Sequence, residues 1–388
     1  MATSRWRGLS ALVRDAVDAT TDLVGVGHAS AHRQIQRAAD VAGVGGPVAP
    51  IREVVHLSTR GTLATTKAVN RLVALLADTA LDAATPVVPD TPPVPLRSDV
   101  TSTQAWIADA ALGALNGSVG DHLAATGNAL DLGMQLRRGD AYLTTEEVDG
   151  AVLVMVHGLA TTEWCWSLEA EAVFGDPAAS LGTLLGEERG LEPIFVRYNT
   201  GRPVRDNGKA LAEALERHVG SATKVVLLGH SMGGLVARAA CEHAAEVGHR
   251  WLGATEWVVT VGTPHHGAPL ARLGAALDAG LAALDTPTTQ VLAGVLSGRS
   301  VGVRDLEQGL GEVPLVAGPR YAFVGTTLTT DPEHPVARGL GDVLVQTVSA
   351  AGPTGGDVEV RRVTVGGVPH YRSQADPAVL DAVRVLLG

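Results

Sequence analysis

The sequence predicts an α/β protein in which a mostly parallel sheet is covered by helices on both faces. From about residue 141 to the carboxyl terminus, short apolar runs alternate with longer amphipathic stretches. Continuously apolar runs are typical of strands buried on both faces, and parallel strands require crossover connections that are usually helical. Before residue 140, apolar residues recur instead at spacings of three and four, which indicates a helical amino-terminal extension.

The composition limits the classes of function. The chain has 388 residues, a formal net charge of −11, 46% hydrophobic and 18% charged residues, so it can fold around a sizeable core. The acidic balance argues against a nucleic-acid partner, which would require a basic face. Only three of the 30 basic residues are lysine, and alanine, glycine, valine and arginine are abundant; this usage indicates a GC-rich bacterial genome.

Metal sites, cofactors and membrane spans are not predicted. We expect Cys165 and Cys241 to be free thiols, because no Cys or Cys/His spacing is that of a zinc site. No Walker or dinucleotide-binding pattern is present. Charged residues interrupt the first 20 positions, and no apolar run reaches the ~18 residues of a transmembrane helix. We therefore expect a cytoplasmic protein.

The expected extension covers residues 1–140. Its predicted parts are helices over 6–17, 51–81 and 103–115, a weaker helical stretch to 136 and a proline-rich linker over 85–96. The apolar stripes must be buried, and we expect them to pack on the α/β domain. The alternatives are a homodimer through these helices or peripheral contact with a membrane surface.

The expected α/β domain covers residues 141–388. Its predicted strands are 151–156, 193–196, 224–228, 257–261, 321–324 and 358–365, and its predicted helices are 207–218, 232–247 and 377–387. The interval 270–318 is longer than a simple crossover and contains helical pieces separated by proline and glycine. We interpret it as a cap or lid inserted above the sheet.

The clearest chemical motif is G-H-S-M-G at residues 229–233. It directly follows a predicted strand and opens a predicted helix, which is the setting of a nucleophile elbow. Side chains at Gly229 and Gly233 would collide with the neighbouring backbone of such a turn. We therefore interpret Ser231 as a nucleophile; the alternative is an ordinary turn with a capping serine.

A serine nucleophile needs a base and an orienting carboxylate. In proteins with this elbow the chain order is Ser, Asp or Glu, then His. His370 follows the last predicted strand and precedes the last predicted helix, so we assign it as the base. The candidate acids between the preceding strand and His370 are Asp331, Asp342 and Asp357, followed by Glu333 and Glu359. Asp342 is favoured, with Asp331 as the main alternative.

The oxyanion hole should combine the N–H of Met232 with one from the loop after the first strong strand. V-H-G-L at 156–159 is that loop, with Leu159 as the expected donor and His157 as a brace. Trp164 and Trp166 are expected to line the acyl pocket or simply to pack on the core. His265, after another strand end, is expected to contact substrate.

Residues 148–387 resemble the α/β-hydrolase superfamily, specifically its lipase-like branch related to GPI inositol-deacylases. The matching motifs are V-H-G-L at 156–159, R-Y-N-T-G-R at 197–202, G-H-S-M-G-G-L-V-A-R at 229–238 and G-T-P-H-H-G-A-P-L at 262–270. Gly341-Asp342 with Ser349-Ala350 is similar to the family's acid motif, although Val343 and Gln346 replace its second glycine and its proline. The resemblance implies an α/β-hydrolase fold with a serine acyl-enzyme.

The expected function is a serine carboxylester hydrolase acting on an apolar acyl ester or lipid. The same triad also supports thioester hydrolysis, amide hydrolysis or acyl transfer, because the fold hosts all of these reactions. A non-enzymatic lipid-surface protein is the third alternative, although a binding module has no need of Ser231, Asp342 and His370 together.

Overall fold

A computed structural model describes residues 93–268, 300–311, 313–334, 341–342, 344–354 and 356–388. The chain divides into two units. The first, Met1–Thr91 with Asn128–Leu130, lies almost entirely outside the described residues. The second comprises Pro92–Gly127 and Asp131–Gly388, and the following description concerns this unit.

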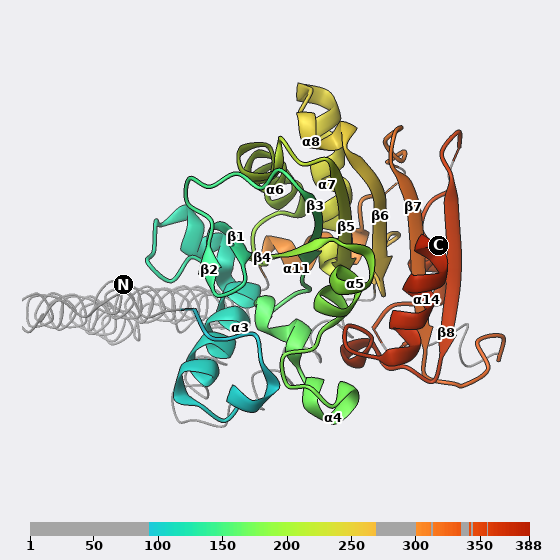
Figure 1. The fold of residues 1–388 in the computed structure, drawn as a ribbon, viewed down its shortest axis with the longest axis horizontal. Coiled ribbons are helices and arrows are strands. Elements are labelled where there is room, and N and C mark those ends of the chain that lie inside the picture. Colours follow the sequence, from blue (N-terminus) through green and yellow to red (C-terminus); the bar gives the residue numbers. More distant parts are fainter. Residues whose placement is uncertain (1–92, 269–299, 312, 335–340, 343, 355) are drawn as a thin grey trace, which may run out of the picture. The chain divides into compact units, whose positions relative to one another are not determined.

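An eight-stranded sheet forms the centre of this unit (Figure 1). Its strand order is β2-β1-β4-β3-β5-β6-β7-β8. The β1–β2 and β1–β4 pairs are antiparallel, and all other neighbours are parallel. The strands are β1 (Met134–Arg138), β2 (Ala141–Tyr142), β3 (Ala151–Val156), β4 (Glu192–Tyr198), β5 (Lys224–His230), β6 (Thr255–Val261), β7 (Arg320–Thr327) and β8 (Val360–Gly366).

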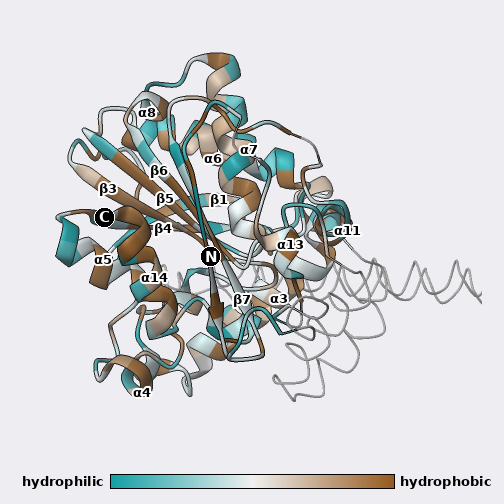
Figure 2. Cartoon of the chain, turned by 90° about the vertical axis from the view of Figure 1, so that its right-hand side faces the viewer, coloured by the Kyte–Doolittle hydropathy of each residue, from teal (hydrophilic) through white to brown (hydrophobic). Residues whose placement is uncertain are grey.

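The central strands are buried on both faces, and this explains their continuously apolar sequences. In β3, Val152 and Val154 pack into one core, whereas the alternating residues Leu153 and Met155 pack into the other. Figure 2 shows β3 and β5 as mostly hydrophobic along their length. The sheet therefore lies between two hydrophobic cores, one on each face.

Helices cover both faces of the sheet (Figure 1). The helices α6 (Val204–Val219), α7 (Met232–Val247) and α8 (Arg250–Gly253) pack on one face, and α5 (Leu181–Arg189) and α14 (Pro377–Leu387) pack on the other. Ser180 and Thr183 form a reciprocal capping box at the start of α5, and Asp376 caps α14. The mostly parallel sheet with helices on both faces is as predicted.

Several shorter helices complete this unit. They are η1 (Ser98–Val100), η2 (Glu163–Ser167), α4 (Ala170–Phe174), α13 (Thr347–Ala350) and η3 (His370–Arg372). A longer helix, α3 (Gln104–Ala125), contacts α11 (Val301–Gln308). The Ser300 hydroxyl donates to the Gly117 carbonyl, and the Val301 N–H donates to the Asp121 carboxylate.

The sheet begins earlier in the chain than expected. Residues 134–138 form a strand where the sequence suggested weak helix, and they pair with β4. The expected domain boundary after residue 140 therefore falls between two paired strands, β1 and β2. Arg137 is buried in β1 because it contacts the Glu163 carboxylate, a long-range ion pair that no local pattern reveals.

Several expectations fall on residues outside the described ranges. These are the helices over 6–17 and 51–81, most of the linker over 85–96 and most of the cap over 270–318. In the part of the chain that is described, none of the helices has both the length and the apolarity to cross a bilayer.

Candidate active site

Ser231 occupies a strained turn between β5 and α7. Its φ of 54° and ψ of −125° are unusual for a residue with a side chain, as a nucleophile elbow requires. A Cβ at Gly229 would lie 2.5 Å from the Gly234 nitrogen, and one at Gly233 would lie 2.1 Å from the Val156 carbonyl oxygen. Only glycine fits these positions, so the motif is required by the turn itself.

Three side chains from separate loops form one hydrogen-bonded row. His370 Nε2 lies 2.9 Å from Ser231 Oγ, and His370 Nδ1 lies 2.8 Å from Asp342 Oδ2. The His370 backbone N–H also donates to the Asp342 carbonyl at 3.1 Å. In such a row an imidazole can accept the serine proton while the carboxylate stabilises the resulting imidazolium.

The Asp342 carboxylate has four hydrogen-bond donors around it. Oδ2 accepts from His370 and from the Thr326 hydroxyl, and Oδ1 accepts from the N–H groups of Leu344 and Val345. Burial would raise the pKa of Asp342, but His370 and these hydrogen bonds hold it below its usual value. Asp331, the alternative acid, is instead exposed, and its carboxylate accepts from the Glu333 N–H.

The loop after β3 lies beside the serine. A Cβ on Gly158 would be 3.1 Å from Ser231 Cβ. The Gly158 carbonyl accepts from His157 Nδ1 at 2.9 Å and from the Thr161 hydroxyl at 3.0 Å. Since Thr161 braces the same carbonyl as His157, it is a site residue that the sequence reading did not identify.

His157 is held as a neutral brace. Its ring is fully buried and stacks on Tyr198, and burial lowers its pKa to about 4. The Tyr198 hydroxyl donates to the His157 carbonyl at 2.8 Å. Both expected oxyanion donors flank this arrangement: Leu159 directly follows Gly158, and Met232 opens α7, where the first N–H groups have no intrahelical acceptor.

The two tryptophans pack within the protein near this loop. The Trp164 ring meets Trp106 in a T-shaped contact with centroids 4.7 Å apart. Trp166 is fully buried, and its ring lies 6.3 Å from that of His230. Both tryptophans belong to the same hydrophobic core, Trp166 with no exposed surface and Trp164 with 9%, as the alternative of core packing expected.

The expectation for His265 requires correction. Its ring is buried against Phe323 with both nitrogens occupied. Arg238 Nη1 donates to His265 Nδ1 at 3.0 Å, which leaves Nε2 as the donor to Thr260 Oγ1. Burial and the Arg238 charge lower the pKa of His265 well below its usual value. His265 links α7 to β6 and has no free group for a substrate.

His230, within the elbow motif, supports the loop that carries His370. His230 Nε2 lies 3.1 Å from Ser373 Oγ, and the Ser373 hydroxyl donates to the His370 carbonyl. Burial, assisted by His370, lowers the pKa of His230 to about 3, so its ring is neutral. Its position next to the serine in the sequence was the available signal for this role.

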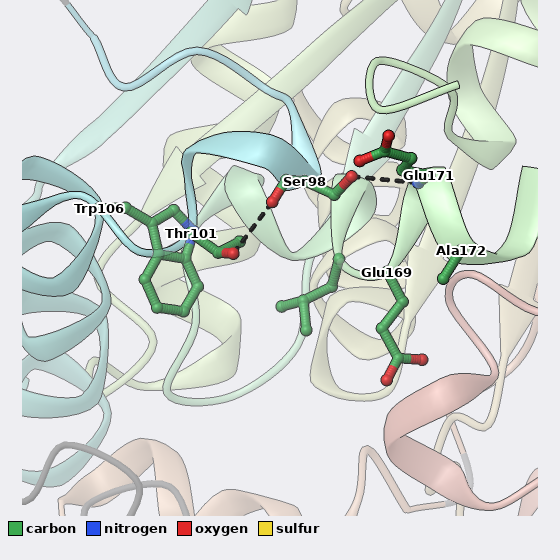
Figure 3. Close-up of a pocket in the computed structure, with 7 residues that line it drawn as sticks. Ser98, Thr101, Trp106, Glu169, Glu171 and Ala172 are labelled. Atoms are coloured by element: carbon green, nitrogen blue, oxygen red, sulfur yellow. Dashed lines mark hydrogen bonds between the residues drawn. The ribbon is translucent and has the colours of Figure 1, made fainter. Parts of the chain in front are cut away.

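A surface cavity of about 510 Å³ is formed by residues in and next to η1, α3, η2 and α4 (Figure 3). Its lining is formed by Ser98, Thr101, Trp106, Leu168, Glu169, Glu171 and Ala172, so it does not include Ser231. Trp106 lines the cavity, and its ring also contacts the ring of Trp164. Among the described residues, no group of three His, Cys, Asp or Glu side chains is arranged to hold a metal ion.

The sheet order, the strained serine and the loop after β3 define an α/β-hydrolase fold, as the resemblance implied. Residues 199–281 match the family model of the PGAP1-like alpha/beta domain. This segment contains the elbow motif and the G-T-P-H-H-G motif. None of the curated proteins matches the sequence.

Several solved structures are similar to this chain. The mature Bacillus licheniformis lipase BlEst2 is 20% identical with a TM-score of 0.43, and the match covers 65% of this chain and 95% of the lipase. The RedJ thioesterase of prodiginine biosynthesis in Streptomyces coelicolor is 17% identical with a TM-score of 0.38, covering 63% and 95%. The N-acyl homoserine lactonase AidH is 14% identical with a TM-score of 0.39, covering 66% and 93%.

Proposed function

We propose that the protein is a serine ester hydrolase that works through an acyl-enzyme at Ser231. The observation that carries this proposal is the row from Ser231 Oγ through His370 to Asp342, with contacts of 2.9 and 2.8 Å. A buried carboxylate, a histidine and a strained serine in that order are the parts that acyl transfer requires.

In the proposed reaction, Ser231 Oγ attacks the ester carbonyl carbon while its proton moves to His370 Nε2. The carbonyl oxygen becomes an oxyanion that accepts from the N–H groups of Leu159 and Met232. Collapse of this intermediate breaks the carbonyl–alkoxy bond, and His370 returns the proton to the leaving alcohol. Water then attacks the acyl carbon while its proton moves to His370 Nε2. Collapse of the second oxyanion breaks the bond between the acyl carbon and Ser231 Oγ, His370 returns the proton to Ser231 Oγ, and the carboxylic acid leaves.

An apolar acyl group is the proposed substrate feature. Its support is in the sequence of 270–318, where Leu273, Leu277, Leu281 and Leu284 recur at helical spacing after the G-T-P-H-H-G motif. Thioesters, amides and acyl acceptors other than water use the same serine chemistry. Assigning Ser231 as the nucleophile therefore does not identify the leaving group, which the assay below addresses separately.

The test is hydrolysis of p-nitrophenyl esters of increasing acyl length by the full chain and by Ser231→Ala. We expect turnover that depends on Ser231 and increases with chain length beyond acetate. Matched ester, thioester and amide substrates with one acyl group then rank the leaving groups. Absence of Ser231-dependent turnover on all three would refute the hydrolase and favour a lipid-surface protein.

A further inference from the structure

The helix α3 lies in direct contact with the loop that contains the expected oxyanion donor Leu159. We propose that Asp109, on this helix, is a positioning residue: through Thr162 it sets the direction of the Leu159 N–H. The inference rests on the proposed function, since it concerns the same serine site. It assigns a role to a helix that lies outside the region resembling α/β-hydrolases.

The direction of the Leu159 N–H depends on the orientation of one peptide unit. In a trans peptide the carbonyl and the following N–H point in opposite directions. Gly158 and Leu159 share such a unit, and no cis peptide is present among the described residues. The Gly158 carbonyl is held by His157 Nδ1 and the Thr161 hydroxyl. The position of Thr161 is therefore one of two constraints on the direction of the Leu159 N–H, the other being His157.

Hydrogen bonds link this loop to α3. The Thr162 hydroxyl donates to Asp109 Oδ2 at 2.7 Å. Both Asp109 oxygens accept from Arg197 Nη2 at 2.8 Å, and Arg197 Nε donates to Glu163 Oε2 at 2.8 Å. Two consecutive residues, Thr162 at the end of the loop and Glu163 at the start of η2, are thus hydrogen-bonded to one buried ion pair between α3 and β4.

This network is charged and almost entirely buried. Glu163 has no exposed surface, and Arg137 and Tyr142 also donate to its carboxylate. Burial opposes ionisation of Glu163, but the charges of Arg197 and Arg137 hold its pKa below the usual value. The buried hydrogen bonds among Asp109, Arg197 and Glu163 therefore restrict the positions that the end of the loop can adopt.

The backbone of the loop also lies against α3. A Cβ at Gly113 would lie 3.0 Å from the Thr161 carbonyl carbon, and one at Gly117 would lie 2.7 Å from Ala160 Cβ. These glycines let the helix approach the loop closely. Ala160 has a φ of 61°, which a residue with a side chain adopts only when its surroundings hold it there.

The experiment compares three variants of the full chain. Thr162→Val removes the hydroxyl that reaches Asp109 but leaves the Asp109–Arg197 pair intact, and Thr162→Ser retains a hydroxyl. Thr255→Val is the matched control, because Thr255 is also buried and its hydroxyl also donates one bond, to the Trp251 carbonyl at 2.9 Å. Urea midpoints report the stability lost by each variant.

Two readouts separate positioning from stability. We expect Thr162→Val to lower kcat on a p-nitrophenyl ester about 10- to 100-fold with KM changed less than about twofold, since complete loss of an oxyanion donor costs about 10²–10³-fold. The affinity of a trifluoromethyl ketone, which forms a tetrahedral adduct with the serine, should fall in parallel. Thr162→Ser should recover both quantities.

Failure of this inference and failure of the proposed function give different results. If Thr162→Val keeps the kcat and ketone affinity of Thr255→Val, Asp109 and Thr162 contribute only stability and the inference is overturned. A rise in KM with kcat unchanged would overturn it as well, because it would indicate weaker substrate binding without loss of an interaction made in the transition state. If the wild-type chain has no Ser231-dependent turnover, the proposed function itself fails, and this inference fails with it.

Discussion

Replacing Asp342 by asparagine should nearly abolish activity without unfolding the protein, for a reason that the hydrogen bonds specify. The N–H groups of Leu344 and Val345 both point at Asp342 Oδ1. An asparagine must keep its carbonyl oxygen there, so its NH₂ replaces Oδ2. That NH₂ would then donate to His370 Nδ1.

A His370 ring that accepts at Nδ1 carries its proton on Nε2 and cannot accept the Ser231 proton. Wrong-tautomer variants of this kind lose about 10⁴-fold in kcat, which corresponds to about 5 kcal/mol of transition-state stabilisation. The assay is kcat/KM on a p-nitrophenyl ester, with the urea midpoint as a measure of folding. Asp331→Asn is the matched control, since Asp331 is exposed.

We expect Asp331→Asn to remain within about twofold of the wild type. A folded Asp342→Asn variant with near wild-type kcat/KM would refute the argument from the tautomer. Loss of activity in Asp331→Asn instead would identify Asp331 as the acid.

Three further perturbations follow from the structure. Gly233→Ala should lower the free energy of unfolding by about 3 kcal/mol or more in urea titrations, because its Cβ would lie 2.1 Å from the Val156 oxygen; an unchanged midpoint would contradict the contact. Burial lowers the pKa of His157 to about 4 in the folded protein, against 6.5 for an ordinary histidine. The unfolded chain therefore binds more protons between these pH values, and the free energy of unfolding falls by about 3 kcal/mol as pH falls from 6.5 to 4. His157→Asn should flatten the pH dependence of the unfolding free energy in that window, and an unaltered slope would count against it. Cys165 and Cys241 are buried, and burial raises both thiol pKa values, that of Cys241 to about 12; iodoacetamide should modify neither before unfolding, and rapid modification of the native chain would be inconsistent with their burial.

The sequence was most informative where one short segment determines its own conformation. The run 151–156 is a strand because all its side chains are apolar, and the elbow at Ser231 is recognisable because its glycines have no alternative. The expected chain order of nucleophile, acid and base pointed to His370 but left several carboxylates open, and Asp342 was favoured among them with the support of its similarity to a family motif. The structure brings Asp342 and His370 to Ser231.

The sequence was least informative where a partner lies far along the chain. β1 was not predicted because Arg137 looks like a surface residue until Glu163 is placed beside it. His265 follows a strand end, as a site residue should, but its ring is turned inward by Arg238. Asp109 and Thr162 are 53 residues apart, so no local pattern connects them.

The most direct measurement of the central claim is covalent labelling of the full chain by a fluorophosphonate, located by mass spectrometry of the digested protein. We predict one adduct, on the peptide that contains Ser231, formed in proportion to the loss of the proposed esterase activity. Ser231→Ala should give no adduct and no activity. An adduct on another residue, or full activity after Ser231 is completely labelled, would contradict the claim that Ser231 is the nucleophile.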